Sequence, residues 1–242
     1  MKYKKACLAI ILLIFLITPL SIGEDSEYEF TFVRLKYNGS YQYRSLWYID
    51  YPTADENLLF QLRKHTNIHV NPRPMVVEVG SHELFDYPFT YIAELGRLNL
   101  SKAEAENLRE YLLRGGFIMT DDFHGTAQWK RFYKQYKKIF PKREPRDIPM
   151  THPLFQCFYK IDKLMQIPAP DAYRRGRTYE KNGRPVRCMG VFDDKGRLMM
   201  MINFNTDLGD AWEHAVDSFY PQKFSNMAFK MGINAIVYTL TH

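Results

Sequence analysis

Hydrophobic and polar residues follow one another along this chain in an order typical of a fold in which strands and helices alternate. Short apolar or alternating runs indicate strands, and they lie at residues 30–35, 75–79, 89–93 and 117–120. Apolar residues three and four positions apart indicate helices, and they lie at 53–66, from 101 to the glycines at 115–116, at about 128–138 and from about 225. This order predicts an α/β fold: a three-layer, doubly wound, mostly parallel sheet with helices on both faces.

Two of the predicted helices begin with the signature of a capping box, in which two side chains three residues apart satisfy each other's backbone amides. Thr53 with Glu56 and Ser101 with Glu104 both match this signature. The second of these helices should end at Gly115-Gly116, because glycine commonly follows a helix C-terminus.

The pattern changes after residue 140. Six prolines between positions 141 and 170 oppose regular structure, and they predict an excursion packed on the main sheet. Apolar runs at 186–191 and 198–204 then flank the turn residues 193–196, which predicts a late β-hairpin. We therefore expect residues 24–242 to form a single domain.

Residues 1–23 predict a cleavable signal peptide. Three lysines precede an apolar run of about 15 residues, which is shorter than the roughly 20 that span a bilayer. Ser21 and Gly23 supply the small residues that signal peptidase requires before its cleavage point. We expect the mature chain to be exported, periplasmic or secreted, and to reach a membrane only if this leader stays uncleaved.

Removal of the leader lowers the formal net charge from +6 to +3, so total charge gives no reason to expect a nucleic-acid partner. Basic residues concentrate locally between positions 130 and 146. They are typical of a solvated helix face, and the alternative is a contact surface for an anionic or protein partner. Cys157 and Cys188 also allow two interpretations: a disulfide in an oxidising compartment, or two buried free thiols.

Polar residues gather where predicted strands end. The strand at 117–120 runs directly into two carboxylates, an aromatic ring and a histidine, and segments 47–52 and 205–213 have a similar character. In open α/β sheets, ligands bind in the crevice beyond the carboxyl ends of the strands, so we expect a site there. The candidate ligand-binding residues are Asp50, Tyr51, Asp55, Asp121, Asp122, Phe123, His124, Asp207, Asp210, Trp212 and Glu213.

These carboxylates support three interpretations. Some could have structural roles: Asp207 or Asp210 could cap the next helix, and Asp55 lies in the first turn of a predicted helix, where the helix dipole favours a carboxylate. Others could hold a divalent metal: Asp121, Asp122 and His124 are the candidate ligands, and the imidazole would favour a transition metal over Ca²⁺ or Mg²⁺. The third interpretation is acid–base catalysis, with Asp122 and His124 as the candidate catalytic residues.

Aromatic residues surround the predicted site and suggest a carbohydrate-like ligand. Flat rings can pack against the C–H faces of a sugar while carboxylates bind its hydroxyls, and binding pockets combine apolar walls with a few polar groups in this way. The alternative is that the rings cover the core. The residues concerned are Tyr41, Tyr43, Trp47, Tyr48, Tyr51 and Trp212.

Several motifs, taken in order along the chain, resemble the DUF4159 family of bacterial proteins, a family without an assigned function. They include Asp50-Tyr51-Pro52, Gly115-Gly116-Phe117, Asp121-Asp122-Phe123, His152-Pro153 and Asp207-Leu208-Gly209-Asp210. The resemblance covers essentially all of residues 24–242. It implies a flavodoxin-like fold related to that of class I glutamine amidotransferases.

Amidotransferases of that fold need a nucleophilic cysteine on a sharp strand-to-helix turn, whereas the matching strand here ends in Asp121-Asp122. The Gly-x-Ser-x-Gly motif of hydrolases is also absent, so whether the domain is an enzyme stays open. The function we expect is non-catalytic binding of a carbohydrate-like or other polar ligand at the strand ends. The alternatives are a metal-dependent hydrolase that uses the acidic loops and an envelope protein-interaction module that uses the basic helix at 130–138.

Overall fold

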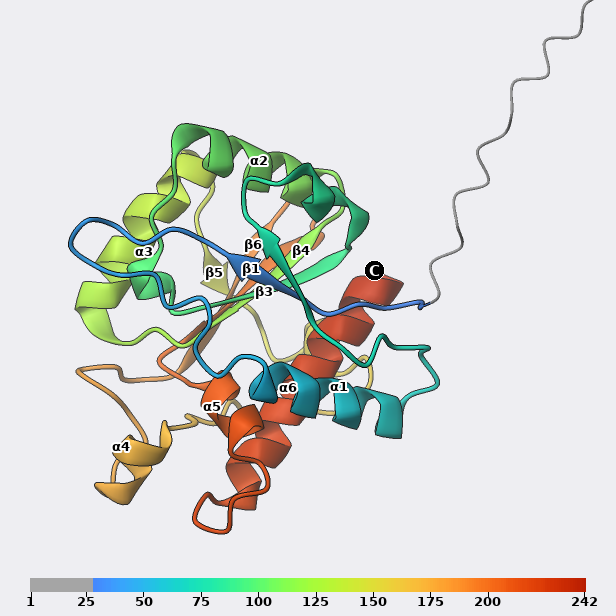
Figure 1. Ribbon diagram of the computed structural model, residues 1–242, viewed down its shortest axis with the longest axis vertical. Coiled ribbons are helices and arrows are strands. Elements are labelled where there is room, and N and C mark those ends of the chain that lie inside the picture. The colour runs from blue at the N-terminus through green and yellow to red at the C-terminus, as the bar shows by residue number, and fades with distance from the viewer. Residues whose placement is uncertain (1–27) are drawn as a thin grey trace, which may run out of the picture.

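The computed structural model describes residues 28–242, so the predicted signal peptide at 1–23 lies outside the described part of the chain. One seven-stranded sheet runs through it, with helices on both faces (Figure 1). The strands are β1 (Val33–Lys36), β2 (Met75–Glu78), β3 (Phe89–Ala93), β4 (Phe117–Asp121), β5 (Arg146–Asp147), β6 (Arg187–Phe192) and β7 (Leu198–Phe204). The α-helices are α1 (Thr53–His65), α2 (Lys102–Leu113), α3 (Gly125–Ile139), α4 (Pro170–Arg174), α5 (Leu208–Glu213) and α6 (Gln222–Thr241), with 3₁₀ turns η1 (His82–Asp86), η2 (Leu95–Arg97) and η3 (Pro153–Phe155).

The strand order is β2-β1-β3-β4-β7-β6-β5. Strands β2, β1, β3, β4 and β7 are parallel to one another, and β6 and β5 continue the sheet in antiparallel pairing. The five parallel strands have the order of a flavodoxin-like sheet, which confirms the predicted α/β class. Strand order reverses between β1 and β3, and ligands of such sheets bind beyond the carboxyl ends of the strands at this point.

Alternating side chains of the strands fill two separate cores. Phe32 and Tyr91 point to one face of the sheet, where α1, α5 and α6 cover them. Val33 and Ile92, their neighbours in sequence, point to the opposite face, which α2 and α3 cover. Because the central strands are buried on both faces, they appear in the sequence as apolar runs.

The two predicted capping boxes have different outcomes. At the start of α2, the Ser101 hydroxyl accepts the Glu104 amide and the Glu104 carboxylate accepts the Ser101 amide, as predicted. The prediction for Thr53 is wrong: α1 begins at Thr53 without a side-chain cap, and the Glu56 amide donates to the backbone carbonyl of Pro52 instead. Backbone carbonyls of the preceding loop thus satisfy the first amides of this helix, since the Asp50 carbonyl also accepts the Ala54 amide.

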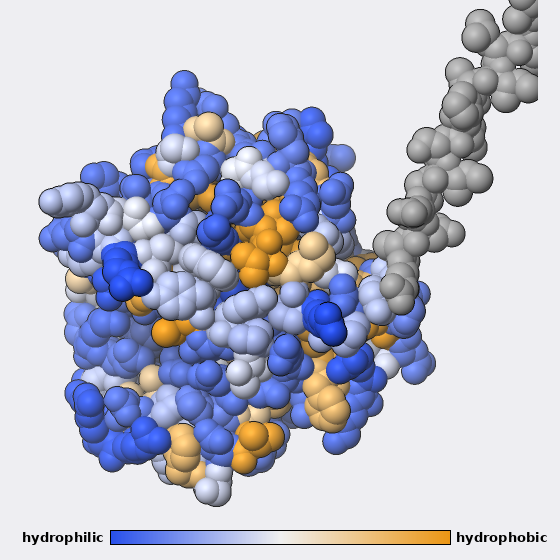
Figure 2. Space-filling view, viewed as in Figure 1, coloured by the Kyte–Doolittle hydropathy of each residue, from blue (hydrophilic) through white to orange (hydrophobic). Residues whose placement is uncertain are grey.

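The late hairpin is confirmed as β6 and β7, and the proline-rich stretch packs beside the sheet. Within that stretch, β5 was not predicted: its two residues pair with β6 and extend the sheet. Cys157 and Cys188 are both free thiols. Among residues 28–242, no helix combines the length and apolarity needed to cross a membrane. The face seen in Figure 2 is mostly hydrophilic, with apolar residues in small separate patches.

Candidate functional site

The site is built from loops that follow the carboxyl ends of β3, β4 and β7. Asp121, the last residue of β4, is fully buried. Its Oδ2 accepts the backbone amides of Leu208 at 2.7 Å and Gly209 at 2.9 Å, and it lies 3.3 Å from the Tyr91 hydroxyl. Asp121 therefore fixes the start of α5 against β4, while its Oδ1 is buried without a hydrogen-bond partner.

Asp122 follows with a positive φ of 52°, which turns its side chain away from the strand. Its Oδ1 lies 3.2 Å from Nε2 of His124, and the Glu180 carboxylate lies 3.6 Å from the same nitrogen. The His124 side chain is only 2% exposed, and its Nδ1 has no hydrogen-bond partner. A nearly buried imidazole thus projects one nitrogen between two carboxylates.

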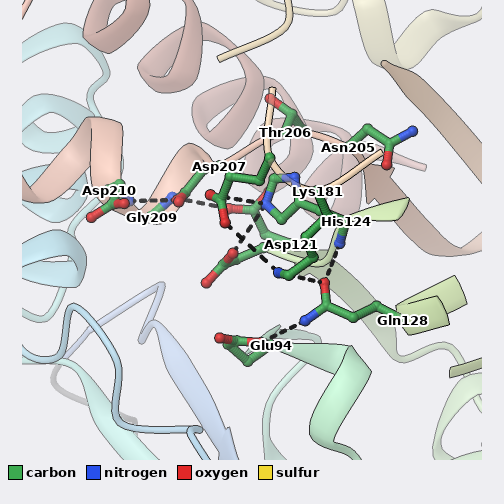
Figure 3. A network of polar contacts seen from close by, with 12 residues as sticks. Glu94, Asp121, His124, Gln128, Lys181, Asn205, Thr206, Asp207, Gly209 and Asp210 are labelled. Atoms are coloured by element: carbon green, nitrogen blue, oxygen red, sulfur yellow. Dashed lines mark hydrogen bonds and ion pairs between the residues drawn. The ribbon is translucent and has the colours of Figure 1, made fainter. Parts of the chain in front are cut away.

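Three more carboxylates lie near Asp122 and His124. Asp207 and Asp210 come from the start of α5, and Asp50 comes from the loop before α1. Asp207 caps α5, because its Oδ1 accepts the Asp210 amide at 2.8 Å. Of the two acids expected to cap this helix, Asp207 and Asp210, it is Asp207 that does so. Oxygens of Asp50, Asp207 and Asp210 lie within 4.8 Å of one another, as do ligand atoms of Asp122, His124, Glu180 and Asp207. We call these residues the carboxylate cluster: Asp50, Asp122, Glu180, Asp207 and Asp210 with His124. Figure 3 shows three of them, His124, Asp207 and Asp210.

Burial and neighbouring charges raise the pKa values of three acids of the cluster, Asp50, Asp207 and Asp210. Burial, together with the charges of Asp210 and Asp122, raises the pKa of Asp50 to about 9. Burial also raises the pKa of Asp210 to about 6 and holds that of Asp207 well above its usual range. Glu94, directly after β3, has its pKa raised to about 8 by burial and the charge of Asp122. If all of these acids were ionised, the site would hold more negative charge than the neighbouring cations neutralise.

Lys181 is the cation whose ammonium group lies among these residues. Its Nζ donates to Gln128 Oε1 at 3.1 Å and lies 3.7 Å from Glu180, and its side chain is 48% exposed (Figure 3). Gln128 in turn donates to Glu94 at 3.5 Å. One half-exposed lysine cannot balance this many acids if all of them ionise.

Unusual backbone conformations concentrate at the same place. Within residues 28–242, every non-glycine residue with positive φ belongs to the site or its border: Asp50, Glu94, Asp122, Lys181 and Asn205. Such conformations cost about 1–3 kcal/mol each and persist where surrounding contacts enforce them. Asn205 shows how, because its Oδ1 accepts the Gly125 amide at 2.9 Å and its Nδ2 donates to the Pro185 carbonyl at 2.7 Å. The loops are therefore held in place by specific bonds.

Not all of the residues predicted for the site lie together in the structure. Asp55 is fully buried and forms a two-pronged ion pair with Arg34, so it belongs to the interior. Phe123 packs in the core beneath α3. Trp212 is 0% exposed and packs against Tyr91, so it lies in the core and not at the rim.

Tyr51 and Glu213 lie at the border of the cluster. Tyr51 is half-buried and packs on Trp47, with the Arg34 guanidinium 5.7 Å from its ring centre. Glu213 lies 3.3 Å from His214, whose Nδ1 is 2.7 Å from Asp217. These contacts form a separate, half-exposed group beside Asp210.

The structure adds residues that the sequence did not suggest. Glu94 comes directly after the last residue of β3, just as Asp121 is the last residue of β4. A search for charged residues at strand ends would therefore have identified Glu94. Glu180 and Lys181 lie in an irregular segment before β6, remote in sequence from any predicted strand end. Only the folding of that segment across the sheet edge reveals their position.

The donor set suits a divalent cation. Carboxylate oxygens suit Mg²⁺, Ca²⁺ and Mn²⁺, whereas an added imidazole shifts the preference to transition metals. In contrast, the sheet edge shows none of the chemistry of an amidotransferase: β4 ends in Asp121, Cys188 is buried within β6, and Cys157 donates to the Asn234 carbonyl beside α6.

Fold and site together define a flavodoxin-like α/β domain with a carboxylate-rich centre at the carboxyl edge of its sheet. The sequence pattern of a domain of unknown function, DUF4159, matches residues 31–240. The chain therefore belongs to the DUF4159 family, which confirms the resemblance seen in the sequence. No curated protein matches the chain.

Proposed function

We propose that this domain binds a divalent metal ion in the carboxylate cluster. The observation that carries the proposal is the convergence of Asp122, His124, Glu180 and Asp207, whose ligand atoms lie within 4.8 Å of one another. Those residues come from three separate segments of the chain. A histidine that is 2% exposed, with its Nε2 directed at two carboxylates, has the position of a metal ligand.

Charge balance supports the same proposal. Carboxylates that repel one another in a partly buried site keep their protons, as the raised pKa values of Asp50 and Asp207 indicate. A divalent cation supplies the missing positive charge and displaces those protons. With three carboxylates and one imidazole, the set favours Mn²⁺, Fe²⁺ or Zn²⁺ over Ca²⁺.

The test is thermal unfolding of the purified protein in EDTA, followed by Ca²⁺, Mg²⁺, Mn²⁺ or Zn²⁺ in excess of the chelator. An ion at 100 times its Kd stabilises a protein by about 2.7 kcal/mol, which corresponds to roughly 5–10 °C for a domain of this size. Asp122→Asn should lose most of this shift. Asp86→Asn is the matched control, because Asp86 is exposed and precedes β3 at the opposite edge of the sheet; it should keep the whole shift.

A melting temperature that no ion changes would contradict the proposal. Equal shifts in Asp122→Asn and Asp86→Asn would also contradict it, since the ion would then bind elsewhere. A bound transition metal would make hydrolysis the class of reaction to test, because metal-bound water loses its proton near neutral pH. This is the metal-dependent hydrolase interpretation of the sequence.

A second candidate is the binding of a carbohydrate-like or other polar ligand at the same edge. The supporting observation is the group of rings formed by Trp47, Tyr48 and Tyr51 immediately before the cluster, with Tyr48 41% exposed. A sugar would stack on these rings and place hydroxyls toward Asp50. Titration of neutral and uronic monosaccharides against tryptophan fluorescence tests this candidate; Trp47→Ala should abolish any response, and an unchanged response would contradict it.

The protein-interaction alternative has less support. Several cations of the basic helix are engaged within the domain: Arg131 donates to the Gly96 carbonyl, Lys138 to that of Leu100, and Lys137 pairs with Glu144. Such bonds reduce the charge that α3 offers to a partner. Export from the cytoplasm remains a prediction from residues 1–23.

A further inference from the structure

The carboxylate cluster contains two overlapping groups of ligands. The first consists of Asp122, His124, Glu180 and Asp207, and the second of Asp50, Asp207 and Asp210. Asp207 belongs to both, and it is the most deeply buried carboxylate of the cluster at 2% exposure. Resting on the metal-binding function proposed above, we infer that Asp207 bridges two divalent metal ions, so that the domain carries a dinuclear centre.

The positions of the side chains fit this arrangement. A carboxylate that offers one oxygen to each of two ions holds them about 3.5–4 Å apart in dinuclear sites. Asp122, Glu180 and His124 would complete the first position, and Asp50 with Asp210 the second. The ligands of the two positions approach Asp207 from different parts of the chain, namely β4 with the segment before β6 on one side, and the loop before α1 with α5 on the other.

Buried polar atoms without hydrogen-bond partners lie in and beside the cluster. His124 is 98% buried, directs Nε2 at Asp122 and Glu180, and has an Nδ1 without a partner. Asp121, fully buried next to Asp122, likewise has an Oδ1 without a partner. Among the hydrogen bonds of residues 28–242, none involves the Asp50 carboxylate, although Asp50 Oδ2 lies so close to Gly209 that a Cβ there would be 2.5 Å away.

A third group of possible ligands, Asp210, Glu213 and His214, lies next to the second. Its imidazole already has partners, because Nδ1 is 2.7 Å from Asp217 and Nε2 is 3.3 Å from Glu213. The group is half-exposed, and the His214 ring contacts all of the acids beside it. It forms a surface ion-pair group and provides a control for the experiment.

The experiment is to measure bound Mn²⁺ per protein by equilibrium dialysis with elemental analysis, and to record the EPR spectrum of the loaded protein. We expect two Mn²⁺ per chain and a spectrum of two exchange-coupled ions. Glu180→Gln and Asp50→Asn should each retain one uncoupled ion, since each removes a ligand from a different position. Asp86→Asn and His214→Asn should still bind two.

Asp207→Asn should bind neither ion with measurable affinity, but this variant also loses part of the α5 cap and could unfold. Glu180→Gln and Asp50→Asn keep the inference testable, because neither side chain has a structural hydrogen bond. One Mn²⁺ per wild-type chain, unaffected by Asp50→Asn, would overturn the dinuclear centre and leave the proposed metal binding intact. Two bound ions without exchange coupling would overturn the bridging role of Asp207. Loss of an ion in His214→Asn would show that the second ion binds at the surface ion-pair group. No bound Mn²⁺ would overturn both the dinuclear centre and the proposed metal binding.

Discussion

Two groups of buried charges lie near the same edge of the sheet, and they are organised in opposite ways. In the first, Arg34 of β1 and Asp55 of α1 are both 0% exposed, with Nε 2.8 Å from Oδ2 and Nη2 2.5 Å from Oδ1. The guanidinium also donates to the carbonyls of Trp47 and Ile49 at 3.1 and 2.9 Å. In the second, the carboxylate cluster, acids face one another around a single imidazole.

The difference shows how charge balance separates a structural group from a functional one. Each of the three Arg34 guanidinium nitrogens donates at least one hydrogen bond, and two of these bonds hold the loop that carries Asp50, so this pair needs no ligand to balance its charge. In the cluster, by contrast, the acids outnumber the cations beside them, and the cation proposed above would balance them. Fold stability should therefore depend on keeping the charges of the first group, whereas removal of a charge from the second should cost little or even stabilise the protein.

The largest effect should come from breaking the balanced pair. Arg34→Met leaves the Asp55 charge buried without a partner, which costs about 3–5 kcal/mol, or on the order of 10 °C in Tm for a domain of this size. The double variant Arg34→Met with Asp55→Leu should recover most of this loss, because apolar residues of similar volume replace such pairs at little cost. A double variant as unstable as the single one would show that lost loop contacts, and not the unpaired charge, dominate.

The next largest effect should be a pH dependence of the metal-free protein. The pKa values of Asp50, about 9, and Glu94, about 8, lie above those of the unfolded chain, so the folded state binds more protons than the unfolded state between about pH 5 and 9. Stability in EDTA should therefore fall as pH rises through this window, by several degrees in Tm. Asp50→Asn should make the dependence shallower. A Tm that rises with pH between 6 and 9 would contradict this.

Asp122→Asn should have a smaller effect on stability than Arg34→Met, and in the opposite direction. Carboxylate oxygens of Asp122, Glu180 and Asp207 lie within 4.8 Å of one another, and two like charges at such a distance repel each other by a few kcal/mol at an effective dielectric constant near 20. Without metal, the variant should gain about 1 kcal/mol of stability, measured by urea denaturation, while its affinity for the ion falls. A clear loss of stability would identify Asp122 as a structural residue.

The smallest effect on stability should come from Gly209→Ala. Its Cβ would lie 2.5 Å from Asp50 Oδ2 and 3.2 Å from the Tyr91 hydroxyl, so the Asp50 carboxylate must move. The gain in helix propensity, about 1 kcal/mol, should offset most of the strain. Metal titration should show weaker binding of the second ion. In the control Gly80→Ala, the nearest atom is Glu104 Cγ at 3.4 Å, and metal binding should not change.

Much of the fold could be predicted because local chemistry already specifies it. The Ser101 capping box, the glycine pair after α2 and the hairpin of β6 and β7 depend on neighbours in sequence, so the sequence alone identifies them. The failed prediction at Thr53 shows the limit of this approach. Its signature was correct, but the Glu56 amide that the Thr53 side chain would have bound donates to the Pro52 carbonyl, at the end of a loop whose Trp47 and Ile49 carbonyls accept hydrogen bonds from Arg34.

The same distinction between local sequence and tertiary contacts applies to the candidate site. The position of Asp121-Asp122 and His124 after an apolar strand was sufficient to predict an edge with polar chemistry, because parallel strands bring their carboxyl ends together. Which acids meet there was decided by the tertiary structure. Asp55 turned inward to Arg34, Trp212 entered the core, and Glu180 came from an irregular segment 56 positions after His124 in the sequence. Sequence patterns determine strands, helices and their edges through local and periodic preferences, whereas the balance of charge in a buried site depends on distances that only the packed chain defines.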